Sequence, residues 1–112
     1  RMTAYTSSNL AWLPTDEDTN IYFHSIVETL REECGYSIDE AAHLTEQYYR
    51  SFTDGEHCNA IGIPTQNDEF FWHEGASGMA LRIHYYMKLK LDPNPMKFID
   101  WRTALYRAQK GA

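Results

Sequence analysis

The residues of this chain best suited to chemistry lie in the stretch FFWHEGASGMALRIHYY, residues 70–86. Its two histidines and its glutamate, His73, Glu74 and His84, could bind a metal ion or transfer a proton. In one continuous helix His73 and His84 would share a face, but about 16 Å of helix axis would separate them. A zinc-protease helix needs two histidines four positions apart, and Ser77 stands where the second would be. The stretch therefore predicts a structural helix.

A second candidate is the pair Glu40 and His43, in the segment EAAH. Helical di-iron proteins use this spacing to place a carboxylate and an imidazole on one metal. The chain has one such pair, so a symmetric dimer would have to supply the other. Further ligands would come from Glu28, Glu32, His57 or His73. A dimeric, metal-dependent helical enzyme, with iron or zinc, is therefore an alternative hypothesis.

The adjacent residues His57 and Cys58 suggest a thiolate with an imidazole base. Adjacent side chains seldom face one another, and the acids Asp54 and Glu56 would raise the pKa of the thiol, the opposite of what a reactive cysteine needs. Cys34 and Cys58 are too few to define a disulfide framework, and we expect both thiols to be free. No P-loop is present in the sequence. We therefore expect no cofactor, and a non-enzymatic function is favoured.

Charge is distributed unevenly along the chain. Residues 1–66 carry eleven acidic and three basic side chains, a balance of −8, and residues 67–112 carry five acidic and seven basic ones, a balance of +2. Together they give the net charge of −6. Such acidity excludes a protein that neutralises nucleic-acid phosphates with its whole surface, and it suits attraction to a basic partner.

Two helices are expected in the first half of the chain. Thr15 or Asp16 can cap a helix whose apolar residues recur with helical spacing until Gly35, which would end it. Ser37 and Glu40 have the spacing of a capping box and predict a second helix that ends near residues 54–55. The short connection between the two helices implies an antiparallel hairpin.

The second half of the chain predicts a loop and two more helices. Residues 53–66 contain two glycines and a proline without helical spacing, so we expect a long loop of the kind often used in recognition. Thr65 and Asp68 have the spacing of a weaker capping pair, after which a long third helix should run to about Leu91, where the sequence DPNP ends it. Apolar residues nearly all round it, and a belt of small residues at 75–80 that would admit another helix, make it the central, buried helix. The last helix should turn four residues inward, namely Phe98, Trp101, Leu105 and Tyr106.

These elements predict an all-α fold, a single domain of about four helices over residues 1–112. Residues 1–14 would form an N-terminal arm held to the body by Leu10, Trp12 and Leu13. The longest apolar run, residues 79–91, is interrupted by charged residues and is shorter than the roughly 20 residues of a membrane-spanning helix. The N-terminus lacks the pattern of a signal peptide, so we expect a cytoplasmic protein without a membrane partner.

The leading functional hypothesis is a protein-binding module that docks on a basic protein partner through its acidic half. A small, acidic, helical and aromatic-rich chain is similar in type to bacterial immunity proteins and antitoxins, although no motif carries that similarity. The expected partner-binding acids are Glu28, Glu32, Glu33, Asp39, Glu40, Glu46, Asp54 and Glu56. The expected aromatic anchors are Tyr36, Tyr48 and Tyr49. A homodimer is compatible with this hypothesis, and a self-associating structural subunit is a third alternative.

Overall fold

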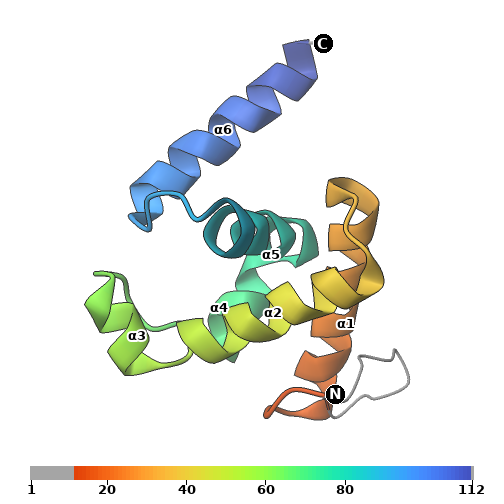
Figure 1. The fold of residues 1–112 in the computed structure, drawn as a ribbon, viewed down its shortest axis with the longest axis vertical. Helices are drawn as coiled ribbons and strands as arrows, with labels where there is room; N and C mark the ends of the chain where they lie inside the picture. Colours follow the sequence, from red (N-terminus) through yellow and green to blue (C-terminus); the bar gives the residue numbers. More distant parts are fainter. Residues whose placement is uncertain (1–11, 112) are drawn as a thin grey trace.

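The structure, a computed structural model, describes residues 12–111 and is helical with no strand over that range (Figure 1). Its elements are α1 (Glu17–Cys34), α2 (Ile38–Phe52), α3 (Gly55–Ala60), α4 (Asp68–Glu74), α5 (Ala76–Ile83), the π-helix η1 (His84–Leu89) and α6 (Pro95–Gly111). The predicted all-α class is confirmed. The predicted number of helices is too small, because the expected long loop contains α3 and the expected third helix is divided.

Helix α1 begins and ends, and α2 begins, where local sequence signals place them, whereas α2 ends at Phe52, before the predicted end near residues 54–55. The Asp16 side chain accepts a hydrogen bond from the backbone N–H of Thr19, and Gly35 ends α1 with a φ of 77°. The Ser37 hydroxyl oxygen accepts a hydrogen bond from the backbone N–H of Glu40 at the start of α2. The chain turns between the two helices, and in Figure 1 α2 crosses α1 rather than running back along it, so the predicted antiparallel hairpin is wrong.

The expected continuous helix, from the Thr65–Asp68 pair to about Leu91, starts later than predicted, with Asn67 as the N-cap of α4, and is interrupted at Gly75. This residue has φ 84° and ψ 160°, a conformation that only glycine adopts readily, and it separates α4 from α5. The backbone then loosens into the π-helix η1, which ends at Lys90 with a φ of 52°. The segment that carries His73 and His84 is therefore three elements instead of one helix.

The expected loop at residues 53–66 contains the short helix α3. The Asp54 side chain caps it by accepting a hydrogen bond from the backbone N–H of Glu56. Cys58 is fully buried, and its thiol donates to the carbonyl oxygen of Phe52 at 3.4 Å. A short element is thus held by its one buried side chain, which a test for helical spacing cannot detect.

Helix α5 is central, as predicted for this segment, and it packs most extensively against α1 (Figure 1). The core around it is aromatic: Phe23 meets Phe71 with ring centroids 5.2 Å apart, and Tyr48 stacks on Phe52 at 4.2 Å. Leu13 is buried in the same core, as expected for the arm, while Leu10 lies outside the described residues.

The role predicted for the small-residue belt needs correction at Gly78. A Cβ atom at this position would lie 3.0 Å from Cγ of Glu74, so the missing side chain makes room for a carboxylate rather than for another helix.

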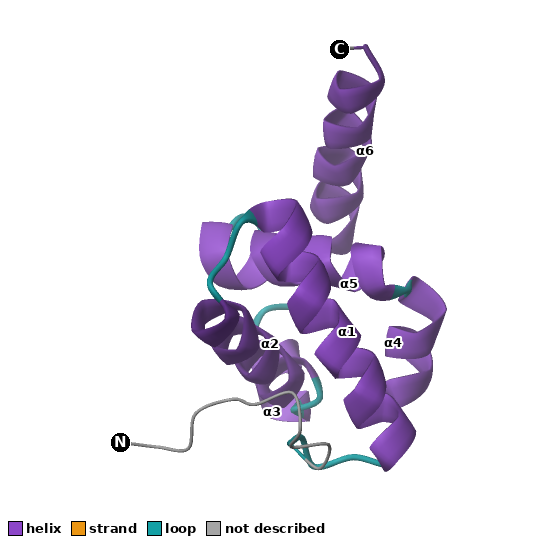
Figure 2. Cartoon of the chain, turned by 90° about the vertical axis from the view of Figure 1, so that its right-hand side faces the viewer, coloured by secondary structure: helices purple, strands orange, loops and turns teal. Residues whose placement is uncertain are grey.

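Helix α6 is attached to the body through its first part, as far as Leu105, and its remainder projects away from the body (Figures 1 and 2). Phe98 is fully buried in a small cluster with Leu81 and Tyr85. The expectation that Tyr106 faces inward is wrong, because the helix has left the body at that point and the side chain is 45% exposed. Over the described range, no helix is both long and apolar enough to cross a membrane.

Candidate functional site

Three of the predicted binding acids already face bases of the same chain. Glu28 pairs with Arg31 at 3.1 Å, and Glu46 pairs with Arg50 at 3.0 Å. A third carboxylate, that of Glu40, pairs with an ammonium group from η1 at 2.7 Å. Of the remaining predicted acids, Asp54 caps α3, and four others are exposed: Glu32, Glu33, Asp39 and Glu56. The predicted surface is therefore partly neutralised.

The predicted tyrosine anchors do not lie at the surface. Tyr48 is fully buried and Tyr49 nearly so, because both lie on the face of α2 that packs into the core. Tyr36 is half-buried, and its hydroxyl is hydrogen-bonded to Nδ1 of His84 at 2.5 Å. Burial raises the pKa of Tyr36 to about 12, and the nearby thiol of Cys34 and carboxyl of Glu40 add to this effect. A partner cannot reach Tyr48 without opening the core, and Tyr49 is only 7% exposed.

A different set of acids meets where α1 and α4 begin. Asp16, Glu17 and Asp18 stand at the start of α1, and Asp68 and Glu69 stand at the start of α4. Acidic side chains are electrostatically favoured in the first turn of a helix, which explains why these five stand at helix starts. The Thr15 hydroxyl donates to Oδ2 of Asp68 at 2.5 Å and joins the two groups. Among the described residues none of these five carboxylates has an ion-pair partner.

An aromatic side chain borders these acids. Trp72 of α4 is 50% exposed and stacks on Tyr22 of α1, with ring centroids 4.7 Å apart and planes at 20°. Its indole N–H donates to Oγ1 of Thr19 at 3.2 Å. Glu69 lies three residues before Trp72 and therefore on the same side of α4, while Asp18 precedes Thr19. We name this surface the acidic edge, made of Asp16, Glu17, Asp18, Asp68, Glu69 and Trp72.

A surface hollow of about 530 Å³ opens beside the acidic edge. It is lined by Tyr49, Thr53, Gln66, Asn67, Asp68 and Glu69. The hollow thus has two carboxylates and two amides on its walls, groups that accept hydrogen bonds from a basic side chain.

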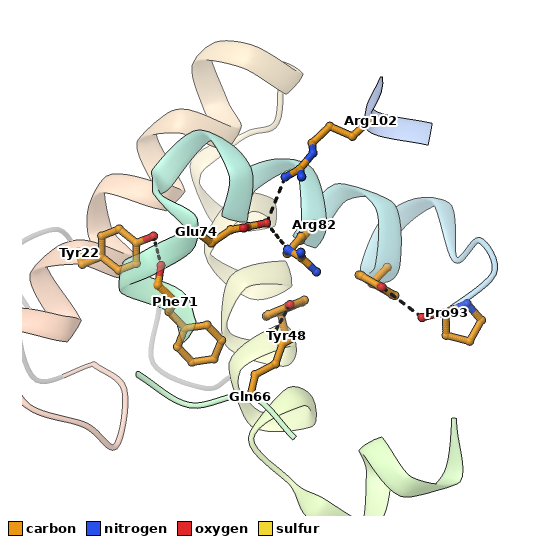
Figure 3. A network of polar contacts seen from close by, with 9 residues as sticks. Tyr22, Tyr48, Gln66, Phe71, Glu74, Arg82, Pro93 and Arg102 are labelled. Carbon is orange, nitrogen blue, oxygen red and sulfur yellow. Dashed lines mark hydrogen bonds and ion pairs between the residues drawn. The ribbon is translucent and has the colours of Figure 1, made fainter. Parts of the chain in front are cut away.

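The orientation of α4 depends on a partly buried ion network (Figure 3). Glu74, the last residue of α4, accepts hydrogen bonds from Arg82 of α5 and, at 3.2 Å, from Arg102 of α6. The Arg82 guanidinium also lies 5.0 Å from the centroid of the Phe70 ring and 4.6 Å from that of Phe98. The network ties three helices together and holds the α4 segment that carries Trp72.

Glu74 also affects a hydroxyl that supports α4 from the side of α1. The Tyr22 hydroxyl donates to the carbonyl oxygen of Phe71 at 2.5 Å (Figure 3). Burial, together with the Glu74 charge, raises the pKa of Tyr22 to about 12. The hydroxyl therefore stays protonated and able to donate at physiological pH.

The residues of the metal-enzyme hypothesis are not assembled. Glu40 is turned to Lys88 of η1, His43 is exposed, and His57 packs on the ring of Phe52. Within residues 12–111 no group of three His, Cys, Asp or Glu side chains is placed to hold a metal ion. The two cysteines are unpaired, and burial raises the pKa of each thiol.

A π-helix is a rare element that often coincides with a functional site. In η1, His84 contacts Tyr36, and Lys88 lies 5.9 Å from the centroid of the Tyr36 ring. Desolvation, and secondarily the charge of Lys88, lowers the pKa of His84. These side chains hold η1 against the segment from Tyr36 to Glu40, which leads into α2.

Sequence alone did not identify Trp72 as an anchor, because its exposure depends on how α4 meets α1. The only signal was the acids at two predicted helix starts, and nothing in the sequence showed that these starts adjoin. In comparisons with protein-family models, curated proteins and solved structures, the chain matched none.

Proposed function

We propose that this chain is a non-enzymatic protein-binding module that docks on a basic protein surface through its acidic edge. The observation that carries the proposal is a firmly held, half-exposed tryptophan bordered by carboxylates that have no ion-pair partner among the described residues. Tryptophan is enriched at the energetically important centres of protein interfaces. The location differs from the one expected from sequence, but the chemistry of the expected partner is the same.

The carboxylates, Trp72 and the hollow would each contribute differently to binding. Carboxylates with no ion-pair partner among residues 12–111 produce negative potential that attracts a basic partner and accelerates encounter. The outer face of Trp72 is available to stack on an arginine guanidinium, since the inner face is covered by Tyr22. The hollow lined by Asp68 and Glu69 can receive a second basic side chain. A module of this design would inhibit a basic toxin or enzyme by covering its surface.

The experiment is a comparison of immobilised variants exposed to lysate of the source organism at low and high salt. Wild type should retain proteins of high isoelectric point, and about 0.5 M salt should release them because it screens exposed charges. Trp72→Ala should lose them, and so should the double variant Asp18→Asn with Glu69→Gln. The matched control, Glu56→Gln with Asp100→Asn, removes the same charge from exposed positions outside the edge and should retain them.

Two results would argue against the acidic edge. Equal loss in the control and edge variants would mean that only net charge matters. Equal retention by wild type and Trp72→Ala would mean that the captured proteins bind elsewhere. Melting curves of each variant exclude unfolding as the cause, because acids at helix starts contribute at most about 1 kcal/mol each at exposed positions.

A further inference from the structure

The free part of α6 is the largest feature that the proposed function leaves unused. The helix is anchored in its first half by Phe98 and by the Arg102–Glu74 hydrogen bond, and Leu105 packs on the same cluster as Phe98. Beyond them the helix runs away from the body in both views (Figures 1 and 2). We call residues 103–110 the C-terminal arm. One face of the arm is exposed and no other described element covers it; this face is formed by Thr103, Tyr106, Arg107, Gln109 and Lys110.

An arm of this kind is under-stabilised in the isolated chain. Helices shorter than about 12–15 residues are marginal in water, and the arm is supported by its continuity with the anchored part of α6 and by the contact of Leu105 with the Phe98 cluster, with no described contact further along. It also presents apolar surface, since Tyr106 is 45% exposed and Leu105 is only partly covered. Contact with another surface would stabilise the helix and bury these side chains.

Charge indicates what that surface is. Residues 12–92 carry fifteen acidic and five basic side chains, a balance of −10, whereas α6 carries one acidic and four basic ones, a balance of +3. With Arg1 these sum to the net charge of −6. A basic helix thus projects from a strongly acidic body that does not cover it. An α6–α6 contact between two copies would bring like charges together, whereas an arm-to-body contact would pair opposite charges.

We infer that the chain forms a reciprocal homodimer in which the C-terminal arm of each copy lies on the acidic α1–α2 connection of the other. Arg107 and Lys110 of the arm are exposed, and so are Glu32, Glu33 and Asp39 around that connection. The connection is at the opposite end of α1 from the acidic edge, about 27 Å away at the rise of an α-helix. A dimer of this form therefore leaves the acidic edge free for another partner.

Sedimentation velocity on the full chain over about two decades of concentration tests the inference, since a dimer forms by mass action. Wild type should shift from 13.1 kDa toward twice that mass, and salt should shift it back. Arg107→Glu with Lys110→Glu should raise the dimer dissociation constant by about tenfold or more. The control, Lys90→Glu with Lys97→Glu, changes the net charge equally at exposed positions outside the arm and should leave the constant unchanged.

A charge swap makes the test specific for the arm-to-body contact. Glu32→Lys with Glu33→Lys should weaken the dimer as the arm variant does, because each homodimer then opposes like charges. Mixing the two variants should restore a dimer, since both arm-to-body contacts again pair opposite charges. A wild type that stays monomeric, an arm variant that dimerises normally, or a mixture that fails to associate would each overturn the inference. Circular dichroism of each variant confirms that the body is folded.

Discussion

Removing the charge of Glu74 should destabilise the fold more than removing that of any exposed acid. The Glu74 side chain is 16% exposed and that of Arg82 is 11% exposed, so neither is well solvated. Glu74→Gln keeps the shape but leaves the Arg82 guanidinium between Phe70 and Phe98 without its carboxylate. Breaking a fully buried pair in this way costs about 3–5 kcal/mol. Because this pair is not fully buried and Arg102 can turn to solvent, we expect about 2–3 kcal/mol.

Urea unfolding followed by circular dichroism measures this free energy directly. At roughly 5 °C per kcal/mol for a domain of this size, the melting temperature should fall by about 10–15 °C. The matched control is Glu28→Gln, which breaks the exposed pair with Arg31 and should cost less than about 0.5 kcal/mol. In an Arg82→Met background, Glu74→Gln should cost about 1–2 kcal/mol less than it does alone, because the two side chains are coupled. Equal effects of Glu74→Gln and Glu28→Gln would refute the assignment of a partly buried network.

Three further measurements follow from the fold. Gly75→Ala should lower the unfolding free energy by about 1–3 kcal/mol, because alanine is strained at a φ of 84°; an unchanged midpoint would show that the α4–α5 break does not need glycine. The lowered pKa of His84 means that the unfolded chain binds this proton more readily, so stability should fall as the pH decreases through the ordinary value of 6.5. The slope of stability against pH should be smaller in His84→Gln, and an unaltered slope would exclude this histidine as a source. Alkylation at neutral pH should modify the half-buried Cys34 before the buried Cys58, and simultaneous labelling would contradict their burial.

Sequence predicted the parts of the fold that local contacts determine. The ends of α1 and α2 depend on caps within a few residues, so Asp16, Gly35 and Ser37 could be read directly. The break at Gly75 was missed because the apolar spacing continues across it, and a glycine inside a helical pattern is compatible with an intact helix. The direction of α6 was equally inaccessible, since it depends on where Phe98 finds its cluster.

The sequence predicted that the candidate surface is acidic, but it did not predict where that surface lies. Acidity is a property of composition, but whether an acid is free depends on its neighbours in space, as the Glu40–Lys88 pair across two elements shows. Tyr48 and Tyr49 looked like anchors because aromatic residues suit both cores and interfaces. Only the tertiary arrangement assigns them to the core and leaves Trp72 at the surface.

Because only the first part of α6 is attached to the body, the charge of its free end can change independently of the stability of the fold. In most small domains the same residues determine both properties. Folding of the body depends on Phe98, Arg102 and the residues that precede them, and Leu105 also packs against the cluster of Leu81, Tyr85 and Phe98. The side chains of residues 106–110 are exposed, so substitutions there are free of the packing constraint that limits change elsewhere in the molecule. The net charge of this segment can therefore be altered by a few substitutions while the melting temperature of the body is preserved.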